Sequence, residues 1–399
     1  GRVPGGGRGG RLRLESLRGG EAAAMKRFPG RVGLQQRVLP GYRAVFFDAL
    51  AEACEGGLSV FAGQPRASEA IHTTTDLQTA QYAAADNRHY FGGALYLCKQ
   101  NGFIEWLEAW QPQALIVEAN PRYINTPAAI RWMQARQRPV IGWGLGAPKL
   151  SGPMAAIRQR QRLNLLNSLD TVIAYSRSGA AEYRALGLPA EKVFVAPNAA
   201  ARRPSAAPKA RRSEFDTRPV VLFVGRLQAR KRIDLLLQAC AALPENLRPR
   251  LLIVGDGPAR GELERLAEGV YPEAEFPGGK HGDELEDYFA RADLFVLPGT
   301  GGLAIQQAMA HGLAVIVAEG DGTQSDLVRP GNGWLVPPGE LAALSGALQT
   351  ALSDAAQLRR MGEAAFHITR DEINIENMVE VFVAALKHVS GESIQAGVK

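Results

Sequence analysis

The residues of this chain best suited to chemistry are two cations, Arg226 and Lys231, which follow a short apolar segment and a glycine. The apolar segment is Val220–Val224, Gly225 comes next, and a helical pattern begins at Ile233. This order places a guanidinium and an ammonium group at the carboxyl end of a buried parallel strand, where open α/β sheets bind ligands. Planar bidentate donors beside a point charge suit phosphate oxygens and predict a diphosphate site. A salt-bridged Arg226 and a solvated Lys231 are the alternative, which this placement disfavours.

A second glycine turn has the features of an anion site. Gly299-Thr300-Gly301-Gly302-Leu303 follows the apolar run Leu294–Pro298 and opens a helical pattern. Glycines let the backbone approach a ligand closely, and free N–H groups at a helix start favour an anion. An ordinary strand-to-helix turn is the alternative for this segment alone. Together the two turns predict one nucleotide-diphosphate site, whose expected contacts are Gly225, Arg226, Lys231, Gly301, Gly302 and Leu303.

Two further segments are candidates to contact the nucleobase. Gly255 lies in a third glycine turn, which follows Leu252–Val254. This turn either shapes a pocket for the base or is an ordinary turn without a ligand. Lys280 and His281 follow Phe276–Gly279, but their side chains suit several bases.

The elements that position these turns alternate along the chain. Apolar runs and helical patterns succeed one another from Val32 onward, which is typical of parallel β/α units. We therefore expect an α/β protein with two doubly wound, Rossmann-like domains facing a cleft. The predicted parts are a disordered Gly/Arg-rich tail (1–24), an acceptor-side domain (25–198), a linker (199–218), a donor-binding domain (219–370), and a C-terminal helix packing back on the first domain, with its tail (371–399).

The predicted strands and helices have the following bounds. Strands are expected at Val32–Val38, Leu58–Ala62, Ala114–Glu118, Pro139–Trp143, Thr171–Tyr175, Val193–Ala196, Val220–Val224, Leu251–Val254, Ala274–Phe276, Leu294–Leu297, Ala314–Val317 and Gly333–Val336. Helices are expected at Tyr42–Cys54, Ile104–Ala109, Thr126–Gln137, Pro153–Asn167, Gly179–Leu186, Leu341–Leu352, Ala355–Ile368 and Ile375–His388. His72–Tyr90 is a long polar stretch and a candidate acceptor loop.

Charge and composition exclude some classes of function. Eight of the 46 basic residues and two of the 40 acidic residues lie in residues 1–31. The rest of the chain has 38 basic and 38 acidic residues, so its formal net charge is zero. The body of the chain thus has no excess positive charge for nucleic acid. The six histidines lack metal-ligand spacing, so no metal is expected. Three widely spaced cysteines and no apolar run long enough to span a bilayer indicate a cytoplasmic protein.

The ordered motifs of the second half resemble the donor-binding domain of retaining glycosyltransferases of family 4, the group 1 glycosyltransferases with the GT-B fold. The matching segments are Val224–Leu227 with Lys231, Ile253–Pro258, Phe276–Gly278, Ala292–Pro298, Ala308–Gly312 and Gly331–Val336. The first half is similar at Val172–Ser176 and Val193–Asn198. The resemblance implies a hexosyltransferase-type enzyme that uses a nucleotide-diphosphate sugar as donor substrate, binds no resident cofactor, and glycosylates a glycan or lipid-linked acceptor with retention.

One departure from the family bears on activity. The family usually has two glutamates in the spacing Glu-x7-Glu, and in this register they are replaced by Gly299 and Gln307. The carbonyl oxygen of Gln307 can still accept a hydrogen bond from a ribose hydroxyl. We favour an active, divergent enzyme, and keep a non-catalytic glycosyltransferase-like subunit or glycan-binding partner as the alternative. A sugar-nucleotide epimerase is a third, weaker interpretation.

The resemblance also implies roles for residues beside the cleft. Arg226 and Lys231 are the expected catalytic residues, because they would stabilise charge developing on the leaving diphosphate. Glu118, at the end of a strand, is either a carboxylate for a two-step reaction or a structural cap. The candidate acceptor-side residues are Arg43, Glu118, Asn120, Arg122 and Trp143.

Two of these candidate residues, and the arginines of one nearby helix, each have two possible roles. Arg43 is either an anion ligand or a solvated arginine at a helix start, and Trp143 either stacks on a sugar or belongs to the core. Arg158, Arg160 and Arg162 indicate a solvated helix face, or, as the alternative, peripheral contact with anionic lipid on the inner membrane face.

Overall fold

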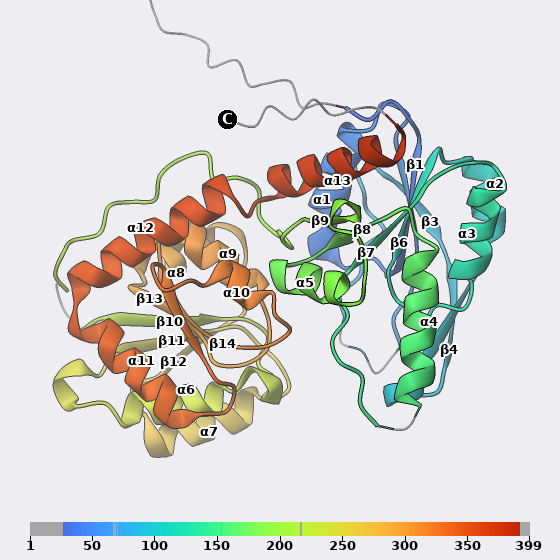
Figure 1. The fold of residues 1–399 in the computed structure, drawn as a ribbon. Helices are drawn as coiled ribbons and strands as arrows, with labels where there is room; N and C mark the ends of the chain where they lie inside the picture. Colours follow the sequence, from blue (N-terminus) through green and yellow to red (C-terminus); the bar gives the residue numbers. More distant parts are fainter. Residues whose placement is uncertain (1–26, 67–68, 70, 153, 216–217, 392–399) are drawn as a thin grey trace, which may run out of the picture.

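The computed structural model describes residues 27–391 except 67–68, 70, 153 and 216–217 (Figure 1). The predicted tail at 1–24 lies outside this range. The described residues form two α/β lobes that lie side by side, each built on a parallel sheet (Figure 1).

The first lobe contains a seven-stranded parallel sheet with the order β3-β2-β1-β6-β7-β8-β9. Its strands are β1 (Val32–Val38), β2 (Leu58–Gly63), β3 (Gln81–Ala84), β6 (Ala114–Glu118), β7 (Val140–Gly144), β8 (Thr171–Ala174) and β9 (Val193–Val195). Its helices are α1 (Ala44–Glu52), α2 (Phe103–Trp110), α3 (Thr126–Gln134), α4 (Ala155–Asn167) and α5 (Arg177–Ala185). The central strands are buried on both faces, which is why they read as continuous apolar runs.

The second lobe repeats this architecture with six parallel strands in the order β12-β11-β10-β13-β14-β15. They are β10 (Val220–Val224), β11 (Arg250–Val254), β12 (Glu275–Gly278), β13 (Leu294–Leu297), β14 (Ala314–Ala318) and β15 (Gly333–Val336). The helices are α6 (Ile233–Ala241), α7 (Arg260–Val270), α8 (Gly282–Arg291), α9 (Leu303–Ala310), α10 (Gln324–Leu327), α11 (Leu341–Ser353) and α12 (Ala355–Asp371). The expected fold class, two Rossmann-like α/β domains, is confirmed.

The C-terminal helix α13 (Ile375–Val389) leaves the second lobe and lies beside α1 of the first (Figure 1). Its Phe382 is fully buried, with ring centroids 5.0 Å from Phe46 and 5.1 Å from Trp143. A second contact between the lobes joins α5 to α10, where the backbone N–H of Arg177 donates to Asp326 Oδ2 at 2.8 Å. The two lobes are therefore connected by packing as well as by the chain.

The residues between β9 and β10 contain no helix or strand in their described part, but Arg211 holds them to the second lobe. Its guanidinium donates to the carbonyl oxygens of Phe289, Ala292 and His311 at 2.7–3.0 Å. Burial lowers the pKa of Arg211 to about 10.

The expectation of an acceptor loop at His72–Tyr90 is wrong for its second part. Residues 81–84 form β3 at the edge of the first sheet, and β4 (Asp86–Tyr90) pairs antiparallel with β5 (Leu97–Asn101). β4 alternates between exposed and half-buried side chains, because it lies outside the main sheet. Its polar sequence therefore gave no indication of a strand.

Candidate functional site

The two glycine turns of the second lobe meet at the carboxyl ends of adjacent strands. β10 pairs in parallel with β13, so the segments that follow them share one edge of the sheet. The backbone N–H of Thr300 donates to the carbonyl oxygen of Arg230 at 3.0 Å. In return, Lys231 Nζ donates to the carbonyl oxygen of Thr300 at 2.6 Å. The cation predicted to bind phosphate thus lies directly on the turn that begins α9.

The ammonium group of Lys231 has no carboxylate partner among the described residues. Burial, and secondarily the charge of Arg230, lower its pKa to about 8. An ammonium held in a desolvated site beside another cation is stabilised by an incoming anion. These features suit a phosphate group.

Arg226 has the opposite surroundings. Its side chain is exposed and makes no hydrogen bond or ion pair within the described part of the chain. The turn that carries it is fixed through its backbone, since the N–H of Leu227 donates to the carbonyl oxygen of Asp256 at 2.9 Å. The guanidinium is therefore available to a ligand while its backbone is held in place.

Gly255 is required by the packing of these turns. Its φ is +147°, and a Cβ there would lie 1.9 Å from the carbonyl oxygen of Gly225. The N–H of Gly255 donates to the carbonyl oxygen of Gly278 at 2.9 Å, which joins the turns after β11 and β12. Lys280, in the loop after β12, forms an ion pair with Glu284 at 3.2 Å.

Gly299 stands where the family has its first glutamate, and here there is no room for any side chain. A Cβ on Gly299 would lie 2.3 Å from the carbonyl oxygen of Arg230 and 2.5 Å from the carbonyl carbon of Lys231. With the Lys231 turn in this position, residue 299 cannot carry a carboxylate.

Gln307 replaces the second glutamate, and its half-buried side chain has no hydrogen bond within the described residues. By contrast, both polar atoms of the preceding side chain, Gln306, form hydrogen bonds with the segment that follows β9. Its Oε1 accepts from the N–H of Ala200 at 2.7 Å, and its Nε2 donates to the carbonyl oxygen of Asn198 at 2.6 Å. Sequence reasoning missed this contact, because it depends on how the lobes meet.

A pocket of about 170 Å³ lies between the lobes at the start of α9. Gly301, Gly302 and Leu303 contribute to it from one side, and Tyr42 and Tyr175 from the other. Arg226 and Lys231 do not line this pocket. Gln324 also lines it, with its Oε1 buried and unpartnered. Neither Tyr175 nor Gln324 was singled out by the sequence.

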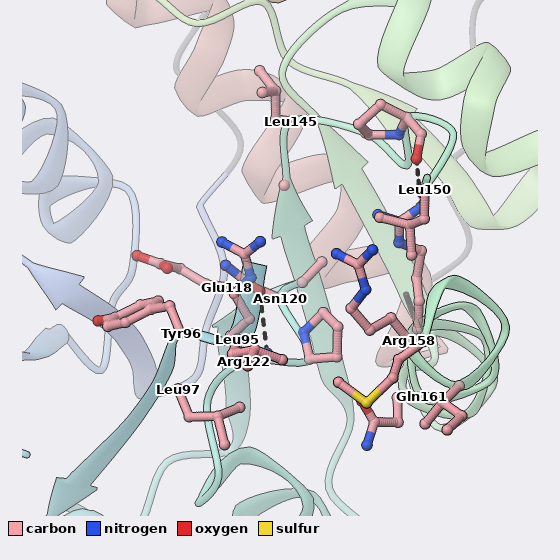
Figure 2. A pocket seen from close by; sticks show the side chains of 18 of the residues that line it. Leu95, Tyr96, Leu97, Glu118, Asn120, Arg122, Leu145, Leu150, Arg158 and Gln161 are labelled. Carbon is pink, nitrogen blue, oxygen red and sulfur yellow. Dashed lines mark hydrogen bonds between the residues drawn. The ribbon is translucent and has the colours of Figure 1, made fainter. Parts of the chain in front are cut away.

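A larger cavity of about 580 Å³ opens in the first lobe at the carboxyl ends of β6 and β7 (Figure 2). Glu118, Asn120, Arg122 and Trp143, four of the five expected acceptor-side residues, line it. Tyr175 lines this cavity and the pocket between the lobes, so the two spaces are neighbours.

Glu118 is the carboxylate of this cavity. Its Oε1 accepts from the backbone N–H of Arg37 at 3.0 Å. Burial raises the pKa of Glu118 above its ordinary value, although the neighbouring Tyr123 hydroxyl and the charges of Arg37 and Arg43 oppose this shift. Burial of this kind favours the protonated form of the carboxyl group.

The alternative that Arg43 is a solvated arginine at a helix start is wrong, because only 4% of this residue is exposed. Its guanidinium lies 4.5 Å from the ring centroid of Trp143 and 5.4 Å from that of Tyr175, as cation–π contacts. Its Nη1 is buried without a hydrogen-bond partner. Trp143 itself is 1% exposed and packs on aromatic rings, so the core role dominates and little of its face is free for a sugar.

The described part of the chain contains neither a cluster of metal-binding side chains nor a membrane-spanning helix. Among residues 27–391, the masked positions aside, no group of three His, Cys, Asp or Glu side chains is placed to hold a metal ion. Within the same part of the chain, no helix combines the length and apolar character needed to cross a membrane.

Two doubly wound α/β domains with ligand-type turns facing each other are the GT-B fold, and comparison with solved structures agrees. The structure of HepE from Anabaena in complex with UDP superposes with a TM-score of 0.62 at 18% identity, covering 90% of this chain and 99% of that one.

The family match lies mainly in the second lobe. Residues 207–367 match the family described as glycosyl transferases group 1. Sulfoquinovosyl transferase SQD2 of Arabidopsis thaliana is 34% identical over 37% of this chain and 29% of that protein. A GDP-mannose-dependent alpha-mannosyltransferase of Mycobacterium tuberculosis is 40% identical over 33% of this chain and 33% of that protein. The chain thus matches about a third of the length of these curated relatives.

Proposed function

We propose that the protein is a group 1 glycosyltransferase of family 4 that moves a hexosyl group from a nucleotide-diphosphate sugar to a glycan or lipid-linked acceptor. The observation that carries this proposal is the contact of Lys231 Nζ with the carbonyl oxygen of Thr300, beside the start of α9. It concentrates positive charge at one helix start on the ligand-binding edge of the sheet. The relatives transfer sugars, and one structural neighbour binds UDP.

The chemistry requires stabilisation of a leaving diphosphate. Arg226 and Lys231 would neutralise charge as the anomeric C–O bond breaks, and the free N–H groups at the start of α9 would add to them. Because Tyr175 lines both the pocket at the start of α9 and the cavity of the first lobe, an acceptor in that cavity would approach the sugar from the opposite lobe.

We further propose that transfer proceeds with retention by attack on the same face as the leaving group. Burial raises the pKa of Glu118 and so disfavours the ionised carboxylate that a nucleophile requires, which favours direct attack by the acceptor over a two-step reaction.

A second candidate function, that of a non-catalytic subunit, is supported by one observation, the glycine at position 299. Because no side chain fits at this position, the carboxylate that the family places near the sugar is absent and has no substitute on the turn. A non-catalytic subunit that retains the GT-B fold and binds a glycan or a partner enzyme is consistent with this loss.

The test is thermal unfolding of the full chain with UDP, GDP, ADP, CMP and dTDP. A nucleotide at 100 times its dissociation constant should add about 2.7 kcal/mol to the free energy of unfolding. Stabilisation by one of them supports the donor site and identifies the base. If no nucleotide stabilises the protein, the non-catalytic function is supported. If the purified protein turns over any nucleotide sugar, the non-catalytic function is excluded.

A further inference from the structure

The cavity of the first lobe combines three cations with an apolar mouth, and this combination indicates which acceptor it takes. Arg122 follows β6, whereas Arg158 and Arg162 project from α4, and all three line the cavity. Figure 2 shows Arg122 and Arg158 on opposite sides of the space. The third arginine of the α4 sequence, Arg160, is exposed and does not line it.

None of the three lining arginines is neutralised by an ion pair within the described residues. Arg158 Nη2 donates to the carbonyl oxygen of Ser151 at 2.6 Å, and its Nε is buried without a partner. Arg162 Nη1 donates to the carbonyl oxygen of Pro148 at 2.8 Å. The side chain of Arg122 makes no hydrogen bond to any described residue. Partly desolvated cations without counter-ions are costly, and an anionic ligand relieves that cost.

Two nearby carboxylates leave the three arginines in excess. Among the described residues, Glu118 is the one acidic residue that lines the cavity, and burial favours its protonated form. Glu182 lies close to Arg162, where its negative charge raises the pKa of Arg162, and its Oε2 accepts from the N–H of Ala147 at 2.7 Å. Burial lowers the pKa of Arg162, and the charges of Arg158 and Arg122 contribute to the shift. The charges of Arg122 and Arg158 therefore both act on Arg162.

The mouth of the cavity is apolar. Ile157, Leu95, Met154 and Leu145 line it and are 57%, 51%, 48% and 38% exposed. Four large apolar side chains exposed around one opening form a patch of the kind that marks a binding surface. A small polar sugar would leave these side chains in water, whereas an acyl or prenyl chain would cover them.

We propose that this cavity binds an anionic amphiphile, a lipid phosphate whose phosphate contacts Arg122, Arg158 and Arg162 and whose hydrocarbon chain covers the apolar mouth. The volume of about 580 Å³ accommodates a phosphate headgroup and the first part of such a chain. As acceptor chemistry this rests on the proposed glycosyltransferase function, but binding of the amphiphile does not. The cavity adjoins the donor-side pocket at Tyr175, so a hydroxyl on the bound headgroup would face the sugar.

The test is calorimetric titration of the full chain with decyl phosphate below its micelle concentration. Inorganic phosphate, decanol and decyl glucoside are the comparison ligands. We expect decyl phosphate to bind at least tenfold more tightly than each of the three. Arg122→Gln and Arg158→Gln should each weaken it about tenfold, because each removes a charge-assisted contact with the phosphate. The Arg122 side chain makes no hydrogen bond within the described part of the chain, so its variant should fold normally.

Matched controls separate this site from non-specific binding. Arg160→Gln removes the same charge from the same helix outside the cavity and should leave the affinity unchanged. Ile157→Ser should weaken decyl phosphate, whereas Val270→Ser, which changes an exposed residue of the second lobe, should not. Equal affinity for decanol or decyl glucoside, an equal loss in Arg160→Gln, or no binding of decyl phosphate would each overturn the proposal. Nucleotide binding, titrated separately, reports on the donor site alone.

Discussion

Lys231 and Thr300 are joined by a hydrogen bond of 2.6 Å from the ammonium group to the backbone carbonyl oxygen. Each residue belongs to a loop that follows a different strand, and β10 and β13 are neighbours in the sheet. The contact holds a partly desolvated cation at the start of α9 without a carboxylate to neutralise it. It also fixes the backbone that leaves no room for a side chain at Gly299.

The first prediction concerns the pH dependence of nucleotide binding. Lys231 has a pKa lowered to about 8, and a bound diphosphate favours its charged form. Affinity for the nucleotide should therefore fall as the pH rises through about 8. Lys231→Arg keeps its charge throughout this range, so its affinity should lose that dependence. Calorimetric titrations at several pH values measure the effect, and a wild-type affinity that stays constant above pH 8 would contradict it.

The same pKa predicts the pH dependence of stability in the absence of nucleotide. In the unfolded chain the ammonium group has its ordinary pKa of 10.5, so between about 8 and 10.5 the unfolded state binds more protons than the folded state. The contribution of Lys231 to the free energy of unfolding should rise with pH across this window and be lost as the pH falls through about 8. Denaturant unfolding of wild type and Lys231→Met across this range isolates the contribution, and equal slopes with pH would count against it.

Arg226 provides a test of ligand binding without a change in stability. The guanidinium is exposed and has no partner within the described residues, so Arg226→Ala should leave the midpoint of thermal unfolding of the free protein unchanged. It should weaken nucleotide diphosphate binding by about 1.5–3 kcal/mol, the usual contribution of a hydrogen bond to a charged group. Arg265→Ala, in the outer helix α7, is the control for loss of charge. Unaltered nucleotide affinity in Arg226→Ala would remove this residue from the proposed site.

The sequence was sufficient to predict much of the sheet framework. The bounds of β1, β6, β10, β13 and β15 agree with the predicted strands, because apolar runs between turn residues are typical of buried parallel strands. β3, β4 and β5 were missed for the opposite reason. They lie at an edge or outside the main sheet. β3 and β4 contain exposed polar side chains, and β5 buries Cys98 and Gln100 but has only two apolar residues.

The candidate site was predictable only within each lobe. That the loops bearing Lys231 and Thr300 share a sheet edge follows from the β/α alternation. The packing of Phe382 on Trp143, the ring that also contacts Arg43, by contrast depends on α13 returning from the other end of the chain. The place of Tyr175 in both pockets, and the bonds of Gln306, depend on the contact between lobes. No local pattern encodes such contacts.

Gly299 and Gly302 form a matched pair for testing the turn. A Cβ at Gly299 would collide with the backbone of Arg230, whereas a Cβ at Gly302 has no atom within 4 Å. Gly299→Ala should therefore lower the free energy of unfolding by about 1–3 kcal/mol, and Gly302→Ala should be tolerated. Gly299→Glu should not restore a family-like carboxylate, because the glutamate cannot occupy this backbone without displacing Lys231. Denaturant unfolding compares the variants, and a stable Gly299→Glu protein with raised transferase activity would refute this account.

Phe382 tests whether the returning helix α13 is part of the first lobe's core. Its ring is fully buried against Phe46 and Trp143, although it comes from a segment that follows the second lobe. Phe382→Ala would leave a cavity at this junction and should lower the free energy of unfolding by about 3–5 kcal/mol. Lys387→Ala, on the same helix but half-buried, should change it by less than about 0.5 kcal/mol. Because Trp143 also contacts Arg43 and lines the acceptor-side cavity, Phe382→Ala should weaken decyl phosphate binding while nucleotide binding is retained. Loss of both affinities in a protein that remains folded would show that α13 supports the whole cleft and not the first lobe alone.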